Sequence, residues 1–149
     1  MQSAQLSEIA RVYDKVPGLI SVIEHMAKPD VLERSDEAQW QEQMRILGQI
    51  ENVHCKLSFS PRGQDIDYYL KNPRQGTFNV KEMIRPFVGF LLNNFDTQRL
   101  MWGSDWPVSI IMQEYRAVRE AFSSLLEEHM APAAGIFCDN AVRFYRIDL

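Results

Sequence analysis

Hydrophobic positions along the chain follow two spacings, and each spacing predicts a different element. Within residues 6–13, nonpolar side chains recur on one helical face, and Pro17-Gly18 then supplies a helix stop. Residues 19–25 form a short run rich in β-branched side chains, which is typical of a strand. A turn at Lys28-Pro29-Asp30 follows this run. The chain is therefore predicted to begin with a helix and a strand.

The same succession recurs in the next part of the chain. A second helix, capped by Ser35 or Asp36, is predicted to end near Gly48. A strand over residues 52–58 follows it directly. The polar stretch 59–76 comes next and is long for a connection inside a compact domain, which is typical of functional loops.

A third helix and strand follow this connection. Asn79 and Glu82 have the spacing of a capping box at the start of a nonpolar helical stripe that extends to Leu91. Pro86 lies within the stripe and is expected to kink the helix or move its start later. Residues 99–104 are predicted to form the last strand.

The rest of the chain is predicted to be helical. One helix covers residues 115–126, and short helices continue from a turn at Pro132 to Tyr145. No linker, repeat or low-complexity tract divides the chain, so we expect residues 1–149 to form a single domain. The resulting order α-β-α-β-α-β-α indicates an α/β fold with parallel strands joined by right-handed crossovers.

Three parallel strands are compatible with an open sheet or with part of a barrel, and side-chain alternation favours the barrel. In the middle strand, one face would carry the nonpolar residues Val53, Cys55 and Leu57. The opposite face would carry His54, Lys56 and Ser58. In the last strand, Met101, Gly103 and Asp105 would point to that same side. An open sheet covered by helices prefers nonpolar residues on both faces, whereas polar residues suit the interior of a barrel near its mouth.

Composition excludes several classes of partner and site. The chain has 149 residues, 46% hydrophobic and 24% charged, with a formal net charge of −4, so no basic field would attract nucleic acid or an anionic membrane. No segment of about 18 nonpolar residues occurs, and residues 1–8 lack the pattern of a leader, so we expect a cytoplasmic protein. Cys55 and Cys138 cannot form a CxxC zinc site, and both are expected to be small buried residues.

Two residues at predicted strand ends are candidates for chemistry. Asp105 closes a nonpolar strand just before Trp106-Pro107, where a carboxylate can accept a proton or bind a metal ion. The alternative is that it only caps that turn. His25 ends the first strand and can offer a lone pair or a hydrogen bond to an oxyanion. The alternative for His25 is a buried residue whose hydrogen bonds are satisfied within the core.

At this point the sequence resembles a known family. Residues 99–108 (Arg-Leu-Met-Trp-Gly-Ser-Asp-Trp-Pro-Val) resemble the strand-eight signature of the amidohydrolase-2 group of TIM-barrel hydrolases. Residues 22–29 and 52–58 are similar to its motifs at strands six and seven, and residues 136–145 to its closing helix. The resemblance implies a partial TIM barrel of about three parallel βα units, equivalent to strands six to eight, plus C-terminal helices.

The resemblance also implies an activity. It indicates a hydrolase in which water attacks a lactone or related ester, with Asp105 as general base or metal ligand. His25 would be a metal ligand or a polariser of the substrate carbonyl. The metal would be a divalent ion such as zinc or manganese, although some members need none. The expected partner is therefore a small-molecule substrate such as a lactone.

Two basic residues are weaker candidates for substrate contacts. Arg62, together with Arg74, lies in the long loop and could clamp a substrate carboxylate, and Lys56 could reach the barrel mouth. For each of them, simple solvation at the surface is the alternative. Phe59 stands where the family usually has a glycine, which leaves the substrate open.

Much of the family's site is missing from the sequence. The His-x-His pair of strand one and the strand-five position have no counterpart, so His25 and Asp105 would be two ligands where a catalytic zinc ion typically has three. We therefore expect the chain alone to be a very poor hydrolase with exposed sheet edges. An open oligomer or a partner chain carrying the first five strands would complete it. The rival hypotheses are a non-catalytic remnant kept for assembly or binding, and a free-standing α/β binding module.

Overall fold

A three-stranded parallel sheet is the centre of the structure, a computed structural model that describes residues 6–16, 18–62, 66, 70–71, 78–111 and 113–148. The strands are β1 (Ser21–Ile23), β2 (Val53–Leu57) and β3 (Leu100–Trp102), in the order β1-β2-β3. Both neighbouring pairs are parallel. The predicted α/β class with three parallel strands is therefore confirmed.

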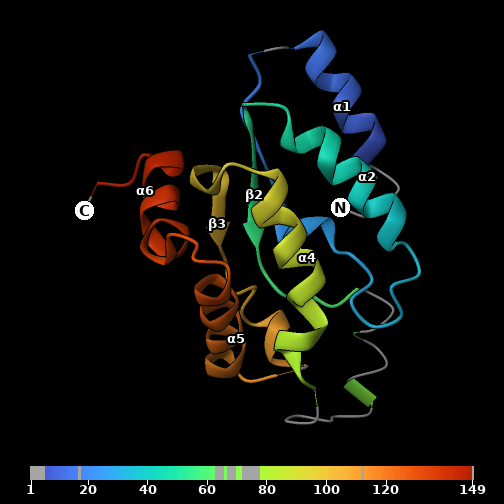
Figure 1. Cartoon of the computed structure of the whole chain (residues 1–149), viewed down its shortest axis with the longest axis vertical. Helices are drawn as coiled ribbons and strands as arrows, with labels where there is room; N and C mark the ends of the chain where they lie inside the picture. Colours follow the sequence, from blue (N-terminus) through green and yellow to red (C-terminus); the bar gives the residue numbers. More distant parts are fainter. Residues whose placement is uncertain are drawn as a thin grey trace.

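Helices connect and cover these strands. They are α1 (Leu6–Lys15), α2 (Glu37–Gly48), α4 (Val80–Asn94), α5 (Tyr115–Glu128) and α6 (Asn140–Tyr145), the last preceded by a π-helical turn at Gly135–Asp139. In Figure 1, α1, α2 and α4 lie to one side of the sheet, and α6 lies on the other side beside β3. The predicted order of helices and strands is thus confirmed.

The hydrophobic core lies between the sheet and helices α2, α4 and α5. In β2 the predicted alternation is confirmed, because Val53, Cys55 and Leu57 are completely buried while His54 and Lys56 are half-buried. Helix α2 adds Trp40, Met44 and Leu47 to this core, all of them completely buried. Burying one such large nonpolar side chain contributes roughly 1.5–3 kcal/mol, so this layer is the main source of stability.

Helix α4 begins as its capping box predicts. The side-chain oxygen of Asn79 accepts a hydrogen bond from the backbone N–H of Glu82 at 3.3 Å. The helix starts at Val80 and continues through Pro86, so the proline does not move the start later. Pro86 therefore lies inside the helix, where it removes the hydrogen bond to the carbonyl of Glu82 and its ring crowds that carbonyl.

Four predictions about local structure were wrong. The strands predicted at 19–25 and 99–104 are shortened to Ser21–Ile23 and Leu100–Trp102, because the chain turns after each of them. The carboxylate of Asp36 does not cap α2; its Oδ1 instead accepts a hydrogen bond from the backbone N–H of Asp30. Cys138 is exposed, because the π-helical turn places it on the outside.

Arg99 fastens the beginning of β3 to the segment between α2 and β2. Its guanidinium donates hydrogen bonds to the carbonyl oxygens of Gly48, Ile50 and Val53 at 2.7 to 2.9 Å. These carbonyls belong to the last residue of α2, to the loop after it and to the first residue of β2, and the first of them lies at a helix end, where backbone acceptors lack intrahelical partners. The Arg99 side chain thereby helps to fix the position of the start of β3 relative to the start of β2.

Candidate active site

Three polar side chains meet at the carboxyl end of the sheet. His25 comes just after β1, Ser58 directly after β2, and Asp105 in the turn after β3. The Nε2 atom of His25 lies 3.3 Å from Oδ1 of Asp105, and its Nδ1 atom lies 2.8 Å from Oγ of Ser58. The structure thus brings together His25 and Asp105, the two leading candidates from the sequence.

The backbone that presents His25 has an uncommon conformation. His25, Met26, Ala27 and Lys28 all have left-handed φ values, between 51° and 60°, and Asp105 has φ 53°. This region is unfavourable for residues with a Cβ atom and persists only where the surroundings hold it. We call residues 25–28 the left-handed turn. Conformations of this kind cluster at functional sites, which supports the assignment of this edge as the site.

Two hydrogen bonds hold the left-handed turn. The backbone N–H of Lys28 donates to the carbonyl oxygen of His25 at 2.7 Å, which closes the turn. The indole N–H of Trp40 on α2 donates to the carbonyl oxygen of Met26 at 2.6 Å, in the core. Helix α2 therefore helps to hold the backbone next to His25.

Burial controls the charge of His25, which lies close to Asp105. Their side chains are 23% and 14% exposed. Burial lowers the pKa of His25, although the negative charges of Asp105 and Glu24 act to raise it. The imidazole is therefore favoured in its neutral form, in which one ring nitrogen donates a hydrogen bond and the other accepts one.

One oxygen of Asp105 is left available. Oδ2 is buried and has no hydrogen-bond partner among the residues that the structure describes. A carboxylate oxygen without a partner in a shielded place is poised to take a proton or to contact a cation. Capping of the following turn does not explain Asp105, because the N–H of Trp106 donates to Oγ of Ser104 instead.

A divalent metal ion would find two ligands at this edge. His25 and Asp105 have the right donor atoms, and their spacing of 3.3 Å suits two ligands of one ion. Among the described residues, however, no three His, Cys, Asp or Glu side chains form a group that could hold a metal. This part of the chain therefore does not form a complete metal site.

Lys56 is held beneath the site by an ion pair. Its ammonium group lies 2.7 Å from Oε1 of Glu24 and 5.2 Å from the ring centre of Tyr145. Burial acts to lower the pKa of Lys56, but hydrogen bonds to Glu24 and Tyr145 outweigh it and raise the pKa. A substrate contact by Lys56 would therefore have to compete with Glu24.

Arg62 joins the loops that follow β1 and β2. Its Nε donates to the carbonyl oxygen of Lys28 at 3.2 Å, and an Nη atom forms a largely buried ion pair with Asp36. The guanidinium thus supports the last residue of the left-handed turn from outside. Arg74 and most of the long loop lie outside the described residues.

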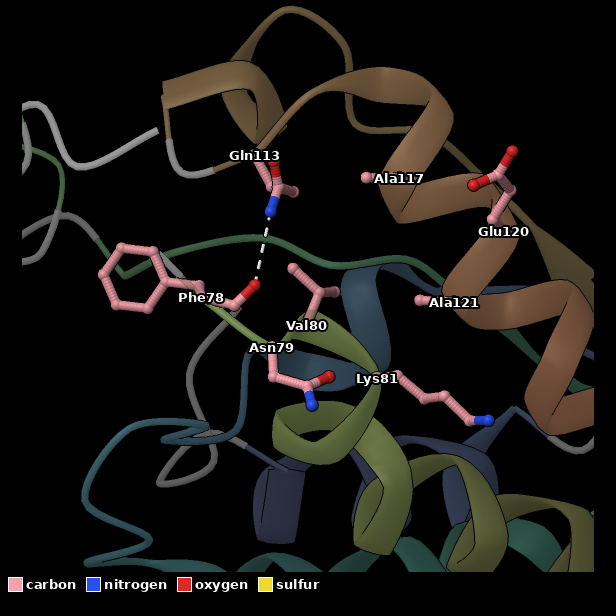
Figure 2. A pocket seen from close by; sticks show the side chains of 8 residues that line it. All are labelled: Phe78, Asn79, Val80, Lys81, Gln113, Ala117, Glu120 and Ala121. Atoms are coloured by element: carbon pink, nitrogen blue, oxygen red, sulfur yellow. Dashed lines mark hydrogen bonds between the residues drawn. The ribbon is translucent and has the colours of Figure 1, made fainter. Parts of the chain in front are cut away.

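A separate cavity of about 300 Å³ lies between α4 and α5 and contains none of the predicted site residues. In Figure 2, the start of α4 forms one wall and α5 the other, and Gln113 donates a hydrogen bond to the carbonyl oxygen of Phe78. The amine of Lys81 at its rim is bound to Ser124 and Glu128. Because this charged group is already paired, the cavity offers little to a ligand.

Two residues near the site were not among the sequence-based candidates. Ser58 contacts His25, and Glu24 pairs with Lys56. The alternation in β2 did indicate that Ser58 shares a face with His54 and Lys56. No signal in the sequence showed which of these three side chains would reach His25, because that depends on the register between strands.

Comparisons with known proteins give the relatives of the chain. A family model described as amidohydrolase matches residues 1–147 of the chain. The chain is 33% identical over 141 residues to an L-fucono-1,5-lactonase of Burkholderia ambifaria, a match that covers 90% of this chain and 44% of that protein. It is 25% identical over 108 residues to a 2-pyrone-4,6-dicarboxylate hydrolase of Comamonas testosteroni, covering 71% of this chain and 33% of that protein.

A solved structure shows the same fold. An amidohydrolase from Burkholderia multivorans, crystallised with bound zinc, superposes with a TM-score of 0.76 at 24% identity. The match covers 99% of this chain and 51% of that one. The chain spans less than half of the length of the curated relatives cited above, and about half of this structure. The expected partial barrel is therefore confirmed as the fold.

Proposed function

The chain belongs to the amidohydrolase family, and on this premise we propose that it supplies one part of the active site of a hydrolase that opens a lactone or related ester. The observation that carries the proposal is the pair formed by His25 and Asp105, with a buried carboxylate oxygen that lacks a partner among the described residues. The lactonase and pyrone-dicarboxylate hydrolase among the relatives support a small cyclic ester as substrate.

In the proposed reaction, Asp105 is the general base. Its carboxylate, in a side chain that is 14% exposed, accepts a proton from a water molecule while the water oxygen forms a bond to the carbonyl carbon of the lactone. The carbon–oxygen bond of the ring then breaks, and the proton on Asp105 passes to the departing alkoxide. Water is added across one bond, the ring opens to a hydroxy acid, and the carboxylate is regenerated.

His25 stabilises the charge that develops on the carbonyl oxygen. A neutral imidazole with its proton on Nε2 can donate a hydrogen bond to this oxygen in place of its contact with Asp105. The burial that lowers the pKa of His25 also strengthens such a hydrogen bond, because less water screens it. The two residues thus have complementary roles, as proton acceptor and as hydrogen-bond donor.

The same residues would serve a metal-dependent form of the enzyme. His25 and Asp105 would contribute two ligands to a zinc or manganese ion, and the others would come from strands that the described residues do not include. When bound, such an ion supplies a water molecule of lowered pKa and polarises the carbonyl group. The lowered pKa of His25 favours the unprotonated ring that metal binding needs.

Arg62 and Lys56 are proposed as secondary contacts to the substrate. Each of them already holds a carboxylate: Arg62 pairs with Asp36, and Lys56 pairs with Glu24. A substrate carboxylate could take the place of either one. Binding of this kind would be weak unless the rest of the barrel adds further contacts.

Activity in this proposal depends on the remainder of the barrel. This chain covers 44% of the Burkholderia ambifaria lactonase and 51% of the Burkholderia multivorans structure, so strands from the remainder of a barrel would have to complete the sheet. These strands would belong to the same polypeptide or to an associated chain. The chain by itself would then hydrolyse lactones very poorly.

A chimera tests the function. The chain would be joined to the part of the Burkholderia ambifaria lactonase that it does not match, and hydrolysis of L-fucono-1,5-lactone would be measured with and without zinc or manganese. We expect activity in the chimera, a loss of about 100-fold or more in its Asp105→Asn variant, and little activity in the chain alone.

The same chimera can also distinguish the proposed hydrolase from its rival, a non-catalytic remnant. A chimera that folds cooperatively but hydrolyses neither this lactone nor other small lactones would contradict the proposal. It would favour a non-catalytic remnant retained for assembly or binding, which the shortage of metal ligands among the described residues also supports. Equal activity in the Asp105→Asn chimera would remove Asp105 from the mechanism.

A further inference from the structure

Ser58 occupies a place next to the proposed catalytic pair that no sequence motif assigns to chemistry. It follows β2 directly, its side chain is 0% exposed, and its Oγ lies 2.8 Å from Nδ1 of His25. On its other side it faces Gly103, where an added Cβ atom would stand 3.8 Å from both Cβ and Oγ of Ser58. The hydroxyl is therefore enclosed between two strands and directed at the imidazole.

The two contacts of His25 determine which ring nitrogen carries the proton. Oδ1 of Asp105 lies 3.3 Å from Nε2, and its lone pairs and negative charge favour the form of the ring that carries its proton on Nε2. The neutral ring then has its lone pair on Nδ1, and Ser58 is placed to donate its hydroxyl hydrogen to that lone pair. The partner of one nitrogen thus selects the state of the other.

We propose that Ser58 is a positioning residue, which holds the His25 ring through Nδ1 and keeps Nε2 turned toward Asp105 and the substrate. This inference rests on the proposed function of the site and adds the group that orients it. A hydroxyl suits this role because it can both donate and accept. If Nε2 binds a metal ion, Nδ1 carries the proton. Oγ of Ser58 can then accept a hydrogen bond from the Nδ1–H group without any movement of the chain.

The same three groups could suggest a serine nucleophile, but the burial of Ser58 argues against it. Serine, histidine and carboxylate are the components of a hydrolytic triad, and their side chains are connected in that order here. A nucleophile must reach the carbonyl carbon of a substrate, whereas the Ser58 side chain has no exposed surface. Its hydroxyl is therefore available to His25 and not to a substrate.

The test uses long-range proton–nitrogen NMR spectra of the chain labelled at histidine, at a pH where the imidazole is neutral. Substitutions of His54 and His129 assign the His25 signals. In the unmodified chain we expect protonated Nε2 and a hydrogen-bonded, unprotonated Nδ1. In Ser58→Ala the Nδ1 signal should shift downfield, toward the position of a nitrogen without a partner.

Two further variants separate positioning from a general loss of packing. Ser60→Ala is the matched control, because Ser60 lies in the same loop and its buried hydroxyl has no partner among the described residues. It should leave the His25 signals unchanged. Ser58→Thr keeps the hydroxyl and should preserve the Nδ1 signal. If Ser58→Ala does not fold, Ser58→Cys takes its place, and its weak donor should give a smaller shift in the same direction.

Three results would overturn the proposal. One is a proton on Nδ1 of His25 in the unmodified chain without metal. Another is a His25 spectrum that is the same in a folded Ser58→Ala or Ser58→Cys variant as in the unmodified chain. The third is covalent labelling of Ser58 by a fluorophosphonate reagent, which would identify a nucleophile. None of these measurements uses lactone hydrolysis, so failure here is distinguishable from failure of the chimera.

Discussion

Gly48 is a residue whose lack of a side chain permits a close approach of two backbones. It is the last residue of α2, and an added Cβ atom would lie 2.4 Å from the carbonyl oxygen of Asn94 at the end of α4. We predict that Gly48→Ala lowers the free energy of unfolding by about 1–3 kcal/mol, because backbone must shift to relieve the overlap. Urea denaturation followed by circular dichroism measures this change.

Gly18 provides the control for that substitution. Among the described residues other than its chain neighbours, no atom lies within 4 Å of the place where its Cβ atom would stand, so Gly18→Ala should change the stability by less than about 0.5 kcal/mol. Equal effects of the two substitutions would show that loss of glycine flexibility matters here, and not the contact between α2 and α4.

At the scale of elements, α2 and the left-handed turn after β1 act as one unit. The hydrogen bond from the Trp40 indole to the Met26 carbonyl lies in the core, where an acceptor without a donor is costly. We predict that Trp40→Phe, which keeps a ring but removes the donor, costs about 1–3 kcal/mol of stability. In NMR spectra of the same variant, the signals of residues 25–28 should shift most.

Trp106 is the matched residue for this experiment, since it is also a tryptophan but is 67% exposed. Trp106→Phe should leave both the unfolding midpoint and the signals of the left-handed turn unchanged. If Trp40→Phe lowers the stability while the signals of residues 25–28 stay in place, the indole contributes packing alone and does not hold the turn.

At the scale of the whole molecule, the sheet has an outer strand on each side. β1 is one edge, and Ile20 next to it is 59% exposed. At the opposite edge, Asn140 donates hydrogen bonds to the carbonyl oxygens of Thr97 and Leu100, which covers the start of β3. The two edges therefore differ, and the edge at β1 is the more open to pairing with another chain.

We therefore predict that the chain by itself associates in solution through the edge at β1. Ile20→Lys should shift the distribution toward monomer, because a charge next to an edge strand opposes strand pairing. Sedimentation velocity over a range of concentrations measures this shift, with urea denaturation to show unchanged folding. A clean, stable monomer of the unmodified chain at every concentration would contradict the prediction.

Much of this architecture could be predicted because it depends on signals close together in the sequence. The capping box at Asn79 and Glu82 marks the start of α4, and the alternation at 53–57 identifies the two faces of β2. The place of His25 and Asp105 at strand ends followed from the same patterns. Their meeting at one edge then follows from parallel strands, whose carboxyl ends lie together.

The left-handed turn could not be predicted. Positive φ values are usually marked by glycine, yet residues 25–28 contain none. The stabilising indole comes from Trp40, which is 14 positions beyond the Met26 carbonyl it binds. The expectation of a longer first strand was wrong for the same reason, because only contacts with α2 and the core hold this turn in place.

The sequence by itself determined the elements, their order, the sheet of parallel strands and the resemblance to a hydrolase family, because periodicity and motifs are local properties. Only the tertiary structure decided that Ser58 contacts His25, that Glu24 holds Lys56 and that Asp36 holds Arg62. These partners depend on the register between strands and on the direction of each side chain at a strand end. Both are set by packing across the whole sheet, which a local pattern does not encode.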